Sequence, residues 1–503
     1  MFRIDPKQAV IEHVASGTDR AGGLSPVARS IAEAPVAETL SGPVIEGVAQ
    51  LVEAGLLLLV GTAIYVVMIG FAPAFYLPAL VATVIVANVG FNILRTHRIS
   101  AYRRLAPQLL RVIPAWLVAC GALAAIIIAL RGTEHHALDW LGAWTLAGLA
   151  ALIAFRIALN QIVLRWTRQG RLKRRTVIVG GGEPAGELIA RIRAQAEDDI
   201  ELLGLFDDRI DQRSPDMVAG CPKLGRVADL VEFARRTPVD LVIVSMPLSA
   251  EKRVLEMLRT LWVLPVDIRL SAHMSQLKFT NTAYSYVGGL PVFDMADRPI
   301  SDWNVVFKWV FDKLVALVAL VLLSPVMVLT AIAIKLESKG PVLFRQDRHG
   351  FNNKTVRIYK FRSMYTDRSD ADAARLVTKG DPRVTHVGRF IRKTSIDEIP
   401  QLFNVLRGEL SIVGPRPHAM QAKAANALYY EAVEGYFARH RVKPGITGWA
   451  QINGWRGETD TIEKLEQRFN HDLYYIEHWS ILFDLYILAM TPVSLLSKTE
   501  NAY

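Results

Sequence analysis

The stretch TSIDEIPQLFNVLRGELSIVGPRP, from Thr394 to Pro417, sets two adjacent carboxylates, Asp397 and Glu398, among basic side chains. The basic residues on either side are Arg389, Arg392, Lys393 and Arg416. A carboxylate can attack phosphorus and carry a phosphoryl group covalently, a neighbouring carboxylate can hold a divalent metal, and guanidinium groups can neutralise phosphate oxygens. The stretch therefore indicates phosphate chemistry that one enzyme could run as a two-step transfer.

The same acids also have a purely structural interpretation. Ser395 followed by Glu398 fits an S-x-x-E capping box, so the acids could simply start the helix that carries Leu402. Pro400 disfavours that register, because a proline beyond the first helical turn removes a hydrogen bond, and it moves the expected cap to Asp397. A helix start also presents free N–H groups to an anion. Capping and catalysis both stay open on this stretch alone.

The composition of the whole chain indicates a membrane protein. Of its 503 residues 51% are hydrophobic, and the net charge of +10 is typical of basic cytoplasmic surfaces, so no nucleic-acid partner is predicted. Cys120 and Cys221 cannot build a disulfide framework, and we expect both thiols to be reduced. Residues 1–48 have scattered charges and no long apolar core, which predicts a disordered cytoplasmic tail without a cleavable signal peptide.

Four apolar stretches then predict a four-helix transmembrane bundle over residues 49–165. The stretches lie near 52–72, 76–94, 112–130 and 141–160. Arginines crowd the second loop and the segment after the fourth stretch, whereas the first and third loops carry only Arg131. By the positive-inside rule, both ends of the bundle face the cytoplasm. Buried helices of a soluble protein would not explain this asymmetry.

From Arg175 the pattern becomes α/β. The strand-like TVIVG leads into Gly180, Gly182 and Ala185 and then a helical stretch, a spacing that resembles the phosphate turn of a dinucleotide-binding βαβ unit. Further strand candidates are LLGLFDD, VDLVIVS and VDIRLS. The acids after the second strand, Asp207 and Asp208, lie further on than the usual spacing, and the glycines could serve only tight packing. A regulatory or assembly role is therefore favoured for this Rossmann-like module, residues 175–295.

The next apolar run, Leu314 to Ile334, has Ser324 and Pro325 at its centre and lysines at both ends. Proline bends a helix, and lysines on both sides favour keeping both ends in the cytoplasm, which predicts a re-entrant helix over residues 308–336 with a break at the Ser-Pro pair. A kinked spanning helix is the alternative. Such a span would place the acid pair away from nucleotide-activated substrates in the cytoplasm, so we favour the re-entrant form.

Cationic side chains recur after this run, among glycine and proline turns and aromatic residues. They are Arg345, Arg348, Lys360, Arg362, Arg439, His440 and Lys443. A solvated basic face is the ordinary explanation for such charges. Their alternation with turns instead suits loops that close over a diphosphate, and the Trp- and Tyr-rich segments near the C-terminus suit a membrane interface.

From about Asn304 onward the sequence resembles the bacterial sugar transferases, the polyprenyl-phosphate hexose-1-phosphate transferases. The matching stretches are FDKLVAL with SPVM, GPVLFRQDRHG, YKFRSM, the acid-pair stretch, RHRVKPGITGWAQINGWRG and DLYYIEHWS. The upstream helices and Rossmann-like module resemble the large membrane-bound branch, the undecaprenyl-phosphate glucose phosphotransferases. The resemblance implies a mainly α catalytic domain over residues 304–503, anchored by the re-entrant helix.

The resemblance also implies residue roles. Asp397 matches the nucleophile, and Glu398 matches a partner acid that helps to bind Mg²⁺. Arg392 and Arg416 look like phosphate ligands, and Asp472 matches a further acidic position. Lys308 and Asp312 look like the residues where the chain enters the membrane helix. Asn353 and Val356 replace a glycine and a phenylalanine that are frequent in the family, so the contacts of that loop stay open.

The implied reaction transfers hexose 1-phosphate, with glucose favoured and galactose or an N-acetylated or deoxy sugar as alternatives, from a UDP-sugar to undecaprenyl phosphate. It would release UMP at the cytoplasmic face of the bacterial inner membrane, as the first membrane step of exopolysaccharide or capsule synthesis. A homodimer through the soluble modules is a further expectation. A membrane-bound dehydratase or epimerase would need a Tyr-x-x-x-Lys pair, which this chain lacks. A non-catalytic export scaffold would have no need of the acid pair with its surrounding cations.

Overall fold

The computed structural model divides into two compact units, which are described separately. Unit 2 comprises Pro35–Arg174 and Glu197–Asp199, and unit 1 comprises the rest of the chain. The described residues are 24–37, 39–70, 76–131, 135–194, 199–209, 215–246, 251–271, 284–287, 290–366, 381–418, 423–424, 427–457 and 461–497.

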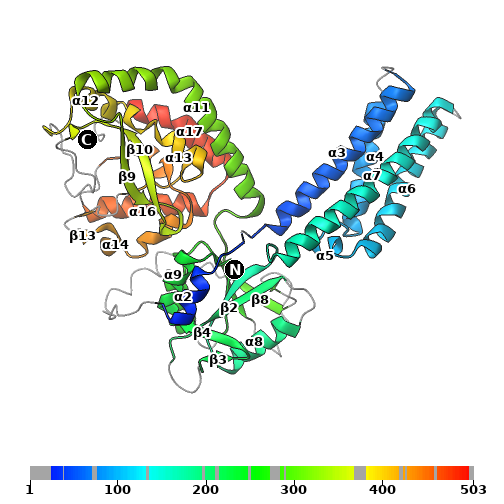
Figure 1. The fold of residues 1–503 in the computed structure, drawn as a ribbon, viewed down its shortest axis with the longest axis horizontal. Coiled ribbons are helices and arrows are strands. Elements are labelled where there is room, and N and C mark those ends of the chain that lie inside the picture. Colours follow the sequence, from blue (N-terminus) through cyan, green and yellow to red (C-terminus); the bar gives the residue numbers. More distant parts are fainter. Residues whose placement is uncertain are drawn as a thin grey trace. The chain divides into compact units, whose positions relative to one another are not determined.

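Unit 2 is a bundle of four long helices with one short helix between them (Figure 1). The helices are α3 (Gly42–Met68), α4 (Tyr76–Ile93), α5 (Ile99–Tyr102), α6 (Leu105–Arg131) and α7 (His135–Arg168). The helix α3 packs against α4 and α7, and α6 packs against the same two helices. At the centre, a Cβ on Gly61 would lie 2.6 Å from Nε1 of Trp144, so a small residue lets these helices approach closely.

The four predicted apolar stretches are thus helices, but most of them extend beyond the predicted ends. The helix α3, for example, begins at Gly42, where Ser41 caps it, and not near residue 52. Its early residue Ala49 packs in a small cluster with Tyr102 of α5 and Leu159 of α7. Hydropathy detects the apolar centre of each helix, whereas packing like this stabilises the more polar turns at its end. The four helices and α11 of unit 1 are long and apolar enough to cross a membrane.

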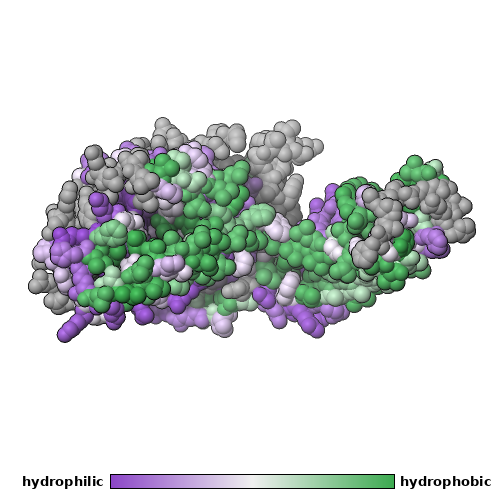
Figure 2. Space-filling model, turned by 90° about the horizontal axis from the view of Figure 1, so that it is seen from above, coloured by the Kyte–Doolittle hydropathy of each residue, from purple (hydrophilic) through white to green (hydrophobic). Residues whose placement is uncertain are grey.

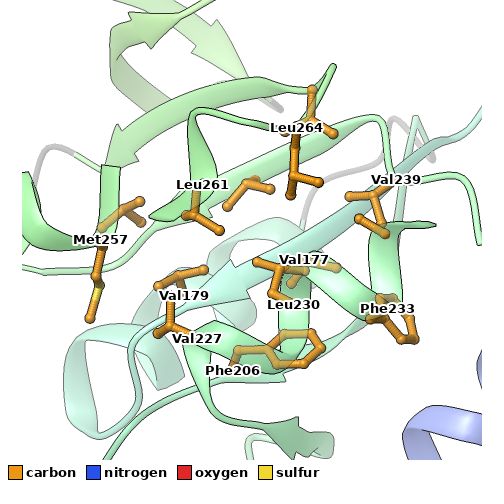
Figure 3. Packing of buried hydrophobic residues seen from close by; sticks show 14 of the residues in the cluster. Val177, Val179, Phe206, Val227, Leu230, Phe233, Val239, Met257, Leu261 and Leu264 are labelled. Carbon is orange, nitrogen blue, oxygen red and sulfur yellow. The ribbon is translucent and has the colours of Figure 1, made fainter. Parts of the chain in front are cut away.

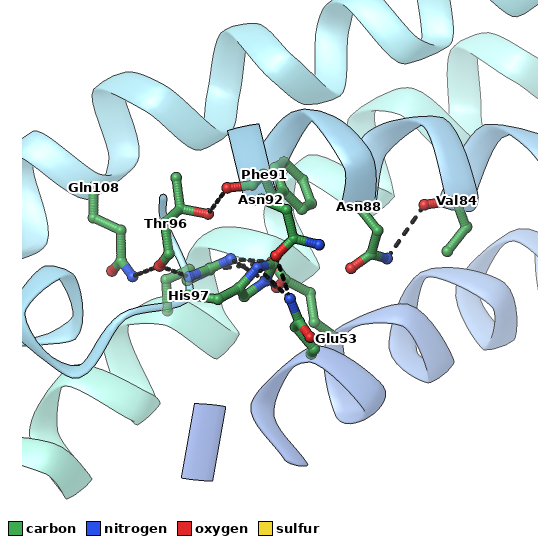
Figure 4. A network of polar contacts seen from close by, with 10 residues as sticks. Glu53, Val84, Asn88, Phe91, Asn92, Thr96, His97 and Gln108 are labelled. Atoms are coloured by element: carbon green, nitrogen blue, oxygen red, sulfur yellow. Dashed lines mark hydrogen bonds and ion pairs between the residues drawn. The ribbon is translucent and has the colours of Figure 1, made fainter. Parts of the chain in front are cut away.

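The bundle buries an ionic cluster that the sequence analysis did not anticipate (Figure 4). The guanidinium of Arg156 lies 2.7 Å from the Glu53 carboxylate, and Nε2 of His97 lies 2.7 Å from the same carboxylate. Both Arg156 and Glu53 are completely buried. Arg156 also donates to the carbonyl of Thr96 in the loop after α4. The cluster therefore ties α3 and α7 to that loop.

In unit 1, an eight-stranded sheet has the order β3-β4-β2-β1-β5-β6-β8-β7. Its elements are β1 (Arg174–Val179), α8 (Glu183–Ala194), β2 (Ile200–Phe206), β3 (Met217–Val218), β4 (Cys221–Gly225), α9 (Val227–Arg236), β5 (Leu241–Val244), α10 (Glu251–Leu261), β6 (Asp267–Ser271), β7 (Tyr284–Val287) and β8 (Leu290–Ala296). The strand β1 pairs in parallel with β5, and β5 with β6, whereas β8 runs antiparallel to β6. The four strands read from the sequence are therefore the centre of this sheet.

Side chains alternate across the sheet and build a core on each face. Val177 and Val179 pack with Leu230 of α9 and Met257 of α10 (Figure 3). Ile178, between the two valines, packs instead with residues of α8 on the opposite face. Helices on both faces of a mostly parallel centre make this a doubly wound module, as its sequence pattern indicated.

The segment expected to be a disordered tail contains a packed helix. The helix α2 (Pro26–Glu33) is capped by Ser25, whose hydroxyl donates to the carbonyl of Leu224 at 2.7 Å. Leu24 and Ala28 are buried in the core between the sheet and α9. The expectation of disorder therefore fails for this part, because a short amphipathic helix finds an apolar face to cover; residues 1–23 lie outside the described residues.

The C-terminal region of unit 1, residues 302–497, surrounds the acid pair with short elements. They are α11 (Asp302–Glu337), β9 (Leu343–His349), η2 (Phe351–Asn353), β10 (Thr355–Phe361), α12 (His386–Lys393), η4 (Ile396–Glu398), α13 (Gln401–Arg407), β11 (Ser411–Val413), β12 (Lys423–Ala424), β13 (Ala427–Leu428), α14 (Tyr429–Ala432), η5 (Tyr436–Arg441), β14 (Gly445–Thr447), α15 (Trp449–Ile452), α16 (Ile462–Glu477) and α17 (Ile481–Ser497). Helices predominate in this region, and its strands pair only two at a time.

The helix α11 is continuous from Asp302 to Glu337, so the break predicted at Ser324 and Pro325 does not interrupt it. Pro325 lies inside the helix, which curves along its length (Figure 1). A proline removes one backbone hydrogen bond and bends a helix without ending it when its neighbours continue. Viewed from above, hydrophobic side chains gather along this helix (Figure 2), and Leu322 and Leu336 are among its most exposed residues.

The first half of α11 is fixed to the C-terminal region by buried charges. Nζ of Lys308 lies 2.6 Å from the carboxylate of Asp484 in α17 and donates to the carbonyl of Val413 at 2.9 Å. Asp312 accepts a hydrogen bond from the Ser411 hydroxyl at 2.9 Å. Lys308 and Asp312 are therefore buried in the first turns of α11, where they attach the helix to the C-terminal region.

The end of α11 contacts a different part of the same region. Ile334 packs with Phe361 of β10 and Ile391 of α12. The Glu337 carboxylate accepts hydrogen bonds from the backbone N–H groups of His386 and Val387, which start α12. Both ends of α11 are therefore attached to one compact body.

We expect Arg156→Met to destabilise the helical bundle strongly. The substitution leaves the buried Glu53 carboxylate without its guanidinium, and breaking a buried ion pair in this way costs about 3–5 kcal/mol. Thermal unfolding of the detergent-solubilised protein should show the loss. Arg165→Met, at an exposed position on the same helix, is the matched control. Adding Glu53→Leu to Arg156→Met should restore part of the stability, and failure to do so would contradict this explanation.

Candidate active site

The acid pair lies in the 3₁₀ helix η4, between α12 and α13. Ser395, just before it, has a φ of 59°, in the left-handed region that few non-glycine residues adopt. The side chains of Asp397 and Glu398 are both buried, at 8% exposure. Two carboxylates buried side by side repel each other unless cations compensate. The surroundings of each acid therefore decide what it can do.

Glu398 is held by two cations from other elements. Nζ of Lys360, on β10, lies 2.8 Å from its Oε1, and the guanidinium of Arg416 donates to both of its oxygens, with Nη1 3.0 Å from Oε2. Burial alone would raise the pKa of Glu398, but the charges and hydrogen bonds of Arg416 and Lys360 lower it well below its ordinary value. Glu398 is therefore a permanent carboxylate that joins β10 to the loop carrying Arg416.

Asp397 is in the opposite condition. Within the described ranges, no hydrogen-bond donor engages its carboxylate. Burial and the negative charge of Glu398 raise the pKa of Asp397 to about 6, although Lys360 and Arg392 act to lower it. An environment that raises the pKa of one acid and lowers the pKa of its neighbour gives the two acids different roles. Asp397 keeps free lone pairs and suits a nucleophile, whereas Glu398 is committed to the framework.

Three of the predicted cations besides Lys360 surround the pair. Arg416 contacts Glu398 directly, and the charge of Arg392 acts on Asp397. Arg348, on the same face of the β9–β10 hairpin as Lys360, donates to Gln346 and to the carbonyl of Pro417, next to Arg416. Its own pKa is lowered to about 10 by burial and by the nearby charge of Arg416. The site therefore concentrates positive charge around two carboxylates.

Two predicted cations do not face the acid pair. One points from the opposite face of its strand, and the other binds the end of a helix. Arg345 points away from Arg348's face of β9 and stacks over the ring of Tyr359, 5.6 Å from its centroid. Arg362 donates to the backbone carbonyls of Ser338 at 2.8 Å and Lys339 at 2.6 Å. Its guanidinium therefore caps the end of α11 instead of reaching the acid pair.

Arg389, Lys443 and His440 also contact other groups. Arg389 is exposed and contacts His386 one turn earlier on α12. Lys443 lies near the charges of Lys308 and Asp312 at the start of α11. The sequence gives the charge of these residues but not the direction in which each side chain points from its helix or loop.

His440 is buried, with its ring stacked on that of His349 at 5.5 Å. Its Nδ1 contacts the side-chain oxygen of Asn353. Burial and the charge of Arg439 hold the pKa of His440 well below its ordinary value. Asn353 adopts a φ of 58°, which explains why glycine or asparagine suits this position, and Val356 pairs with Arg348 across the hairpin.

Arg439 was expected in loops that close over a diphosphate, and Asp472 as a further acidic position; the structure pairs the two beneath the Arg416 loop. They form a buried ion pair at 2.6 Å, with Arg439 only 1% exposed. Arg439 also donates to the Tyr436 hydroxyl at 2.8 Å and to the carbonyl of Arg416 at 2.8 Å. Its hydrogen-bonding groups thus support the Arg416 loop from the protein side.

The sequence analysis missed several residues of this layer. Arg456 donates to the Ser395 hydroxyl beside the acid pair. His418 is buried between two arginines, with Arg439 at its Nδ1 and Arg468 at its Nε2. Arg456 lay in a quoted motif, and its charge could have been noted, whereas no local pattern marks His418 or Arg468.

In the Rossmann-like module, the glycine turn has the geometry of close packing. Gly180 and Gly182 have φ values of 100° and 82°, and a Cβ on Gly180 would lie 2.9 Å from the carbonyl oxygen of Ser245. Ala185, in the first turn of α8, is buried against the sheet. These contacts fit the packing interpretation of the turn.

The acids after the second strand are already engaged. Asp207 is buried against the guanidinium of Arg209 at 3.1 Å, and Arg209 also donates to the carbonyl of Gly181. Asp208 accepts a hydrogen bond from the backbone N–H of Val227 at the start of α9. The side chain of Arg209 therefore crosses the turn that a dinucleotide phosphate would approach.

The fit of the acid pair to a metal ion can be judged from its free lone pairs. Within the described ranges, no three His, Cys, Asp or Glu side chains converge. Mg²⁺ takes octahedral oxygen coordination and commonly draws most ligands from water and substrate phosphates. Because both oxygens of Glu398 already accept hydrogen bonds, the pair fits Mg²⁺ only as a partial ligand set that phosphate oxygens would complete.

Comparison with known proteins matches two parts of this chain to known families. A family described as bacterial sugar transferase matches residues 303–498, and one described as CoA-binding domain matches residues 92–272. A UDP-glucose:undecaprenyl-phosphate glucose-1-phosphate transferase of Klebsiella pneumoniae is 39% identical over 353 residues, which cover 69% of this chain and 73% of that protein. The chain belongs to the bacterial sugar transferases.

Two further relatives of this sugar transferase extend the match. A protein of the same name from Xanthomonas campestris pv. campestris is 33% identical over 432 residues, 85% of this chain and 88% of that one. An undecaprenyl-phosphate glucose phosphotransferase of Komagataeibacter xylinus is 42% identical over 349 residues, 69% of this chain and 64% of that protein. The matched segment thus covers slightly less than two thirds of the latter.

We expect Asp397 of this sugar transferase to take up a proton as the pH falls through about 6, whereas Glu398 stays ionised. Infrared difference spectroscopy should detect the protonated carboxyl band, and Asp397→Asn should remove it. Arg392→Gln deletes a charge that lowers the pKa of Asp397, so the midpoint should move to higher pH. A band that survives in Asp397→Asn would contradict the assignment.

Proposed function

We propose that this chain transfers hexose 1-phosphate, most readily glucose 1-phosphate, from a UDP-sugar to undecaprenyl phosphate, and that Asp397 carries the phosphosugar between the two. The observation that carries the proposal is the contrast between Asp397, whose carboxylate is free, and Glu398, whose two oxygens already accept hydrogen bonds from Lys360 and Arg416. The names of the relatives support the donor and the acceptor.

In the first step, an Oδ atom of the Asp397 carboxylate attacks the sugar-linked phosphorus of the UDP-sugar. A P–O bond forms as the bond to the bridging oxygen breaks, and UMP leaves with that electron pair. The product is an acyl phosphate on the enzyme. Asp397 must be ionised for this attack, and Lys360 and Arg392 favour its charged form.

In the second step, a phosphate oxygen of undecaprenyl phosphate attacks the same phosphorus. The bond to the Asp397 oxygen breaks, the carboxylate returns, and undecaprenyl-diphosphate sugar is released. The two displacements need no separate base, because both attacking groups are already anions near neutral pH.

The surrounding cations balance the phosphate charge in both steps. Arg416, fixed by Glu398 and by the Arg439 contact to its carbonyl, would bind phosphate oxygens, and the charge of Arg392 also acts at Asp397. A bound Mg²⁺ ion would supply further charge neutralisation of the diphosphate, with Glu398 as one carboxylate ligand. A role in exopolysaccharide or capsule assembly follows from the product, a lipid-linked sugar.

We also propose that α11 enters and leaves the membrane on one side, the cytoplasmic face of the inner membrane. A straight helix of its 36 residues would be about 54 Å long and would separate its ends by more than the membrane's thickness. Instead, Lys308 near one end and Glu337 near the other are bonded to the same compact region. Its exposed apolar face suits lipid, and the acid pair then lies near the level of a lipid phosphate.

The covalent step is tested with UDP-glucose labelled at the sugar-linked phosphate, in the absence of lipid. We expect wild-type protein to release UMP and to retain one label per active site, and Asp397→Asn to do neither, because an amide does not attack phosphorus. Asp347→Asn removes an exposed carboxylate from β9 and is the matched control. Screening UDP-galactose and N-acetylated donors in the same assay identifies the sugar.

Label trapped on Asp397→Asn protein would refute the nucleophile. UMP release that requires undecaprenyl phosphate would refute the two-step scheme, since it would mean that donor and acceptor react in one complex.

The topology is tested with single cysteines at Asn304 and Lys339, exposed positions near the two ends of α11, in a protein lacking Cys120 and Cys221. A membrane-impermeant maleimide should label neither in intact spheroplasts and both after permeabilisation. Labelling of one position from outside would show that α11 spans the bilayer.

A further inference from the structure

A further arginine reaches the acid pair from a segment that the proposed mechanism does not use. Arg456, half-buried after α15, donates through Nη2 to the Ser395 hydroxyl, two residues before Asp397. The negative charges of Glu398 and Asp397 and the positive charge of Arg416 all act on the pKa of Arg456. Among the described residues it has no carboxylate partner of its own. Its remaining N–H groups are therefore available beside the nucleophile.

A buried arginine fixes where Arg456 points. Nε of Arg468, on α16, donates to the carbonyl of Trp455 at 2.8 Å, and its Nη2 donates to the carbonyl of Gly457 at 3.2 Å. These carbonyls flank Arg456 on both sides. Arg468 is only 4% exposed, so its guanidinium is committed to this contact and to His418. Burying a guanidinium costs desolvation free energy, and here the charge holds two carbonyls of one loop. We therefore infer that the position of this loop matters.

The same helix holds the other arginine of the site. Asp472 lies one turn after Arg468 on α16 and pairs with Arg439, which donates to the carbonyl of Arg416. His418 lies between Arg439 and Arg468 and joins the two supports. One face of α16 thus fixes two loops, and each loop presents a guanidinium to the acid pair.

We propose that Arg456 binds phosphate oxygens of a substrate as a further guanidinium beside Arg416, and that Arg468 is the residue that positions it. Two guanidiniums brought close together repel unless an anion lies between them, and phosphate oxygens accept hydrogen bonds from both. The inference rests on the proposed function and extends its binding site. The phosphate could belong to the UDP-sugar or to the lipid, and the two half-reactions distinguish these sources.

The test measures an apparent KM for UDP-glucose from the donor dependence of the single-turnover UMP burst without lipid, and KM for undecaprenyl phosphate from steady-state product formation. Arg456→Ala should raise one of the two by roughly 10- to 100-fold, the weight of a hydrogen bond to a charged group. A rise for UDP-glucose places Arg456 on the donor diphosphate, and a rise for the lipid places it on the acceptor phosphate. Arg456→Lys should recover part of the loss, since it retains the charge without the planar fork.

Arg468→Met should raise the same KM as Arg456→Ala while leaving kcat much less changed, because the loop moves but Asp397 does not. Adding it to Arg456→Ala should give little further loss. Lys464→Ala removes one positive charge from an exposed position on the same helix and should leave both KM values unchanged.

Two results would overturn the inference. One is an Arg456→Ala protein whose KM values both match wild type; the other is Ser395→Ala reproducing the whole Arg456→Ala effect, which would make Arg456 a support for the Ser395 turn. Wild-type protein that releases UMP from no UDP-sugar would instead refute the proposed function itself, so the two failures are distinguishable.

Discussion

The bond between Glu398 and its two cations is the interaction on which the site depends. It connects the β10 strand, the 3₁₀ helix of the acid pair and the loop that carries Arg416. An isolated carboxylate at this depth would take up a proton, because burial disfavours charge; with Lys360 and Arg416 it stays ionised. Once Glu398 is charged, its field raises the pKa of Asp397, and the cations keep that rise moderate. Fold and reactivity are therefore set by the same contact.

The site is built mainly on loops, and the surrounding structure supplies its rigidity. Short segments bring in Arg416 and Arg456, and α16 holds both through Arg439 and Arg468. Loops can place side chains around a ligand more freely than a strand can, but they need external support to keep a geometry that phosphate transfer requires. This explains why so many charged groups of the region are buried and contact backbone carbonyls instead of solvent.

Much of this could be predicted where the signal is local. The apolar stretches predicted the bundle helices, and the strand pattern predicted the centre of the sheet. The adjacent acids and Arg416 predicted the central residues of the site. Predictions failed where the direction of a side chain mattered. Arg345 and Arg348 are three residues apart on one strand and therefore face opposite ways, and only Arg348 interacts with the charges of the acid pair. The Glu53–Arg156 cluster could not be foreseen, because it joins residues from two helices that are distant in sequence. Arg439 carried the expected charge, but its guanidinium is buried in an ion pair with Asp472.

The membrane helix explains a further feature of the chain. An apolar helix on a polar enzyme needs fixed points, and α11 has buried contacts to the C-terminal region near each end. At the first, Lys308 satisfies Asp484 and the Val413 carbonyl inside the protein, so its charge does not have to remain in water. Val413 ends the strand that leads to Arg416, and hence the helix start and the phosphate-binding loop share one short stretch of backbone. In the proposed topology, a lipid phosphate approaching along α11 would meet a site whose position is fixed by the same helix.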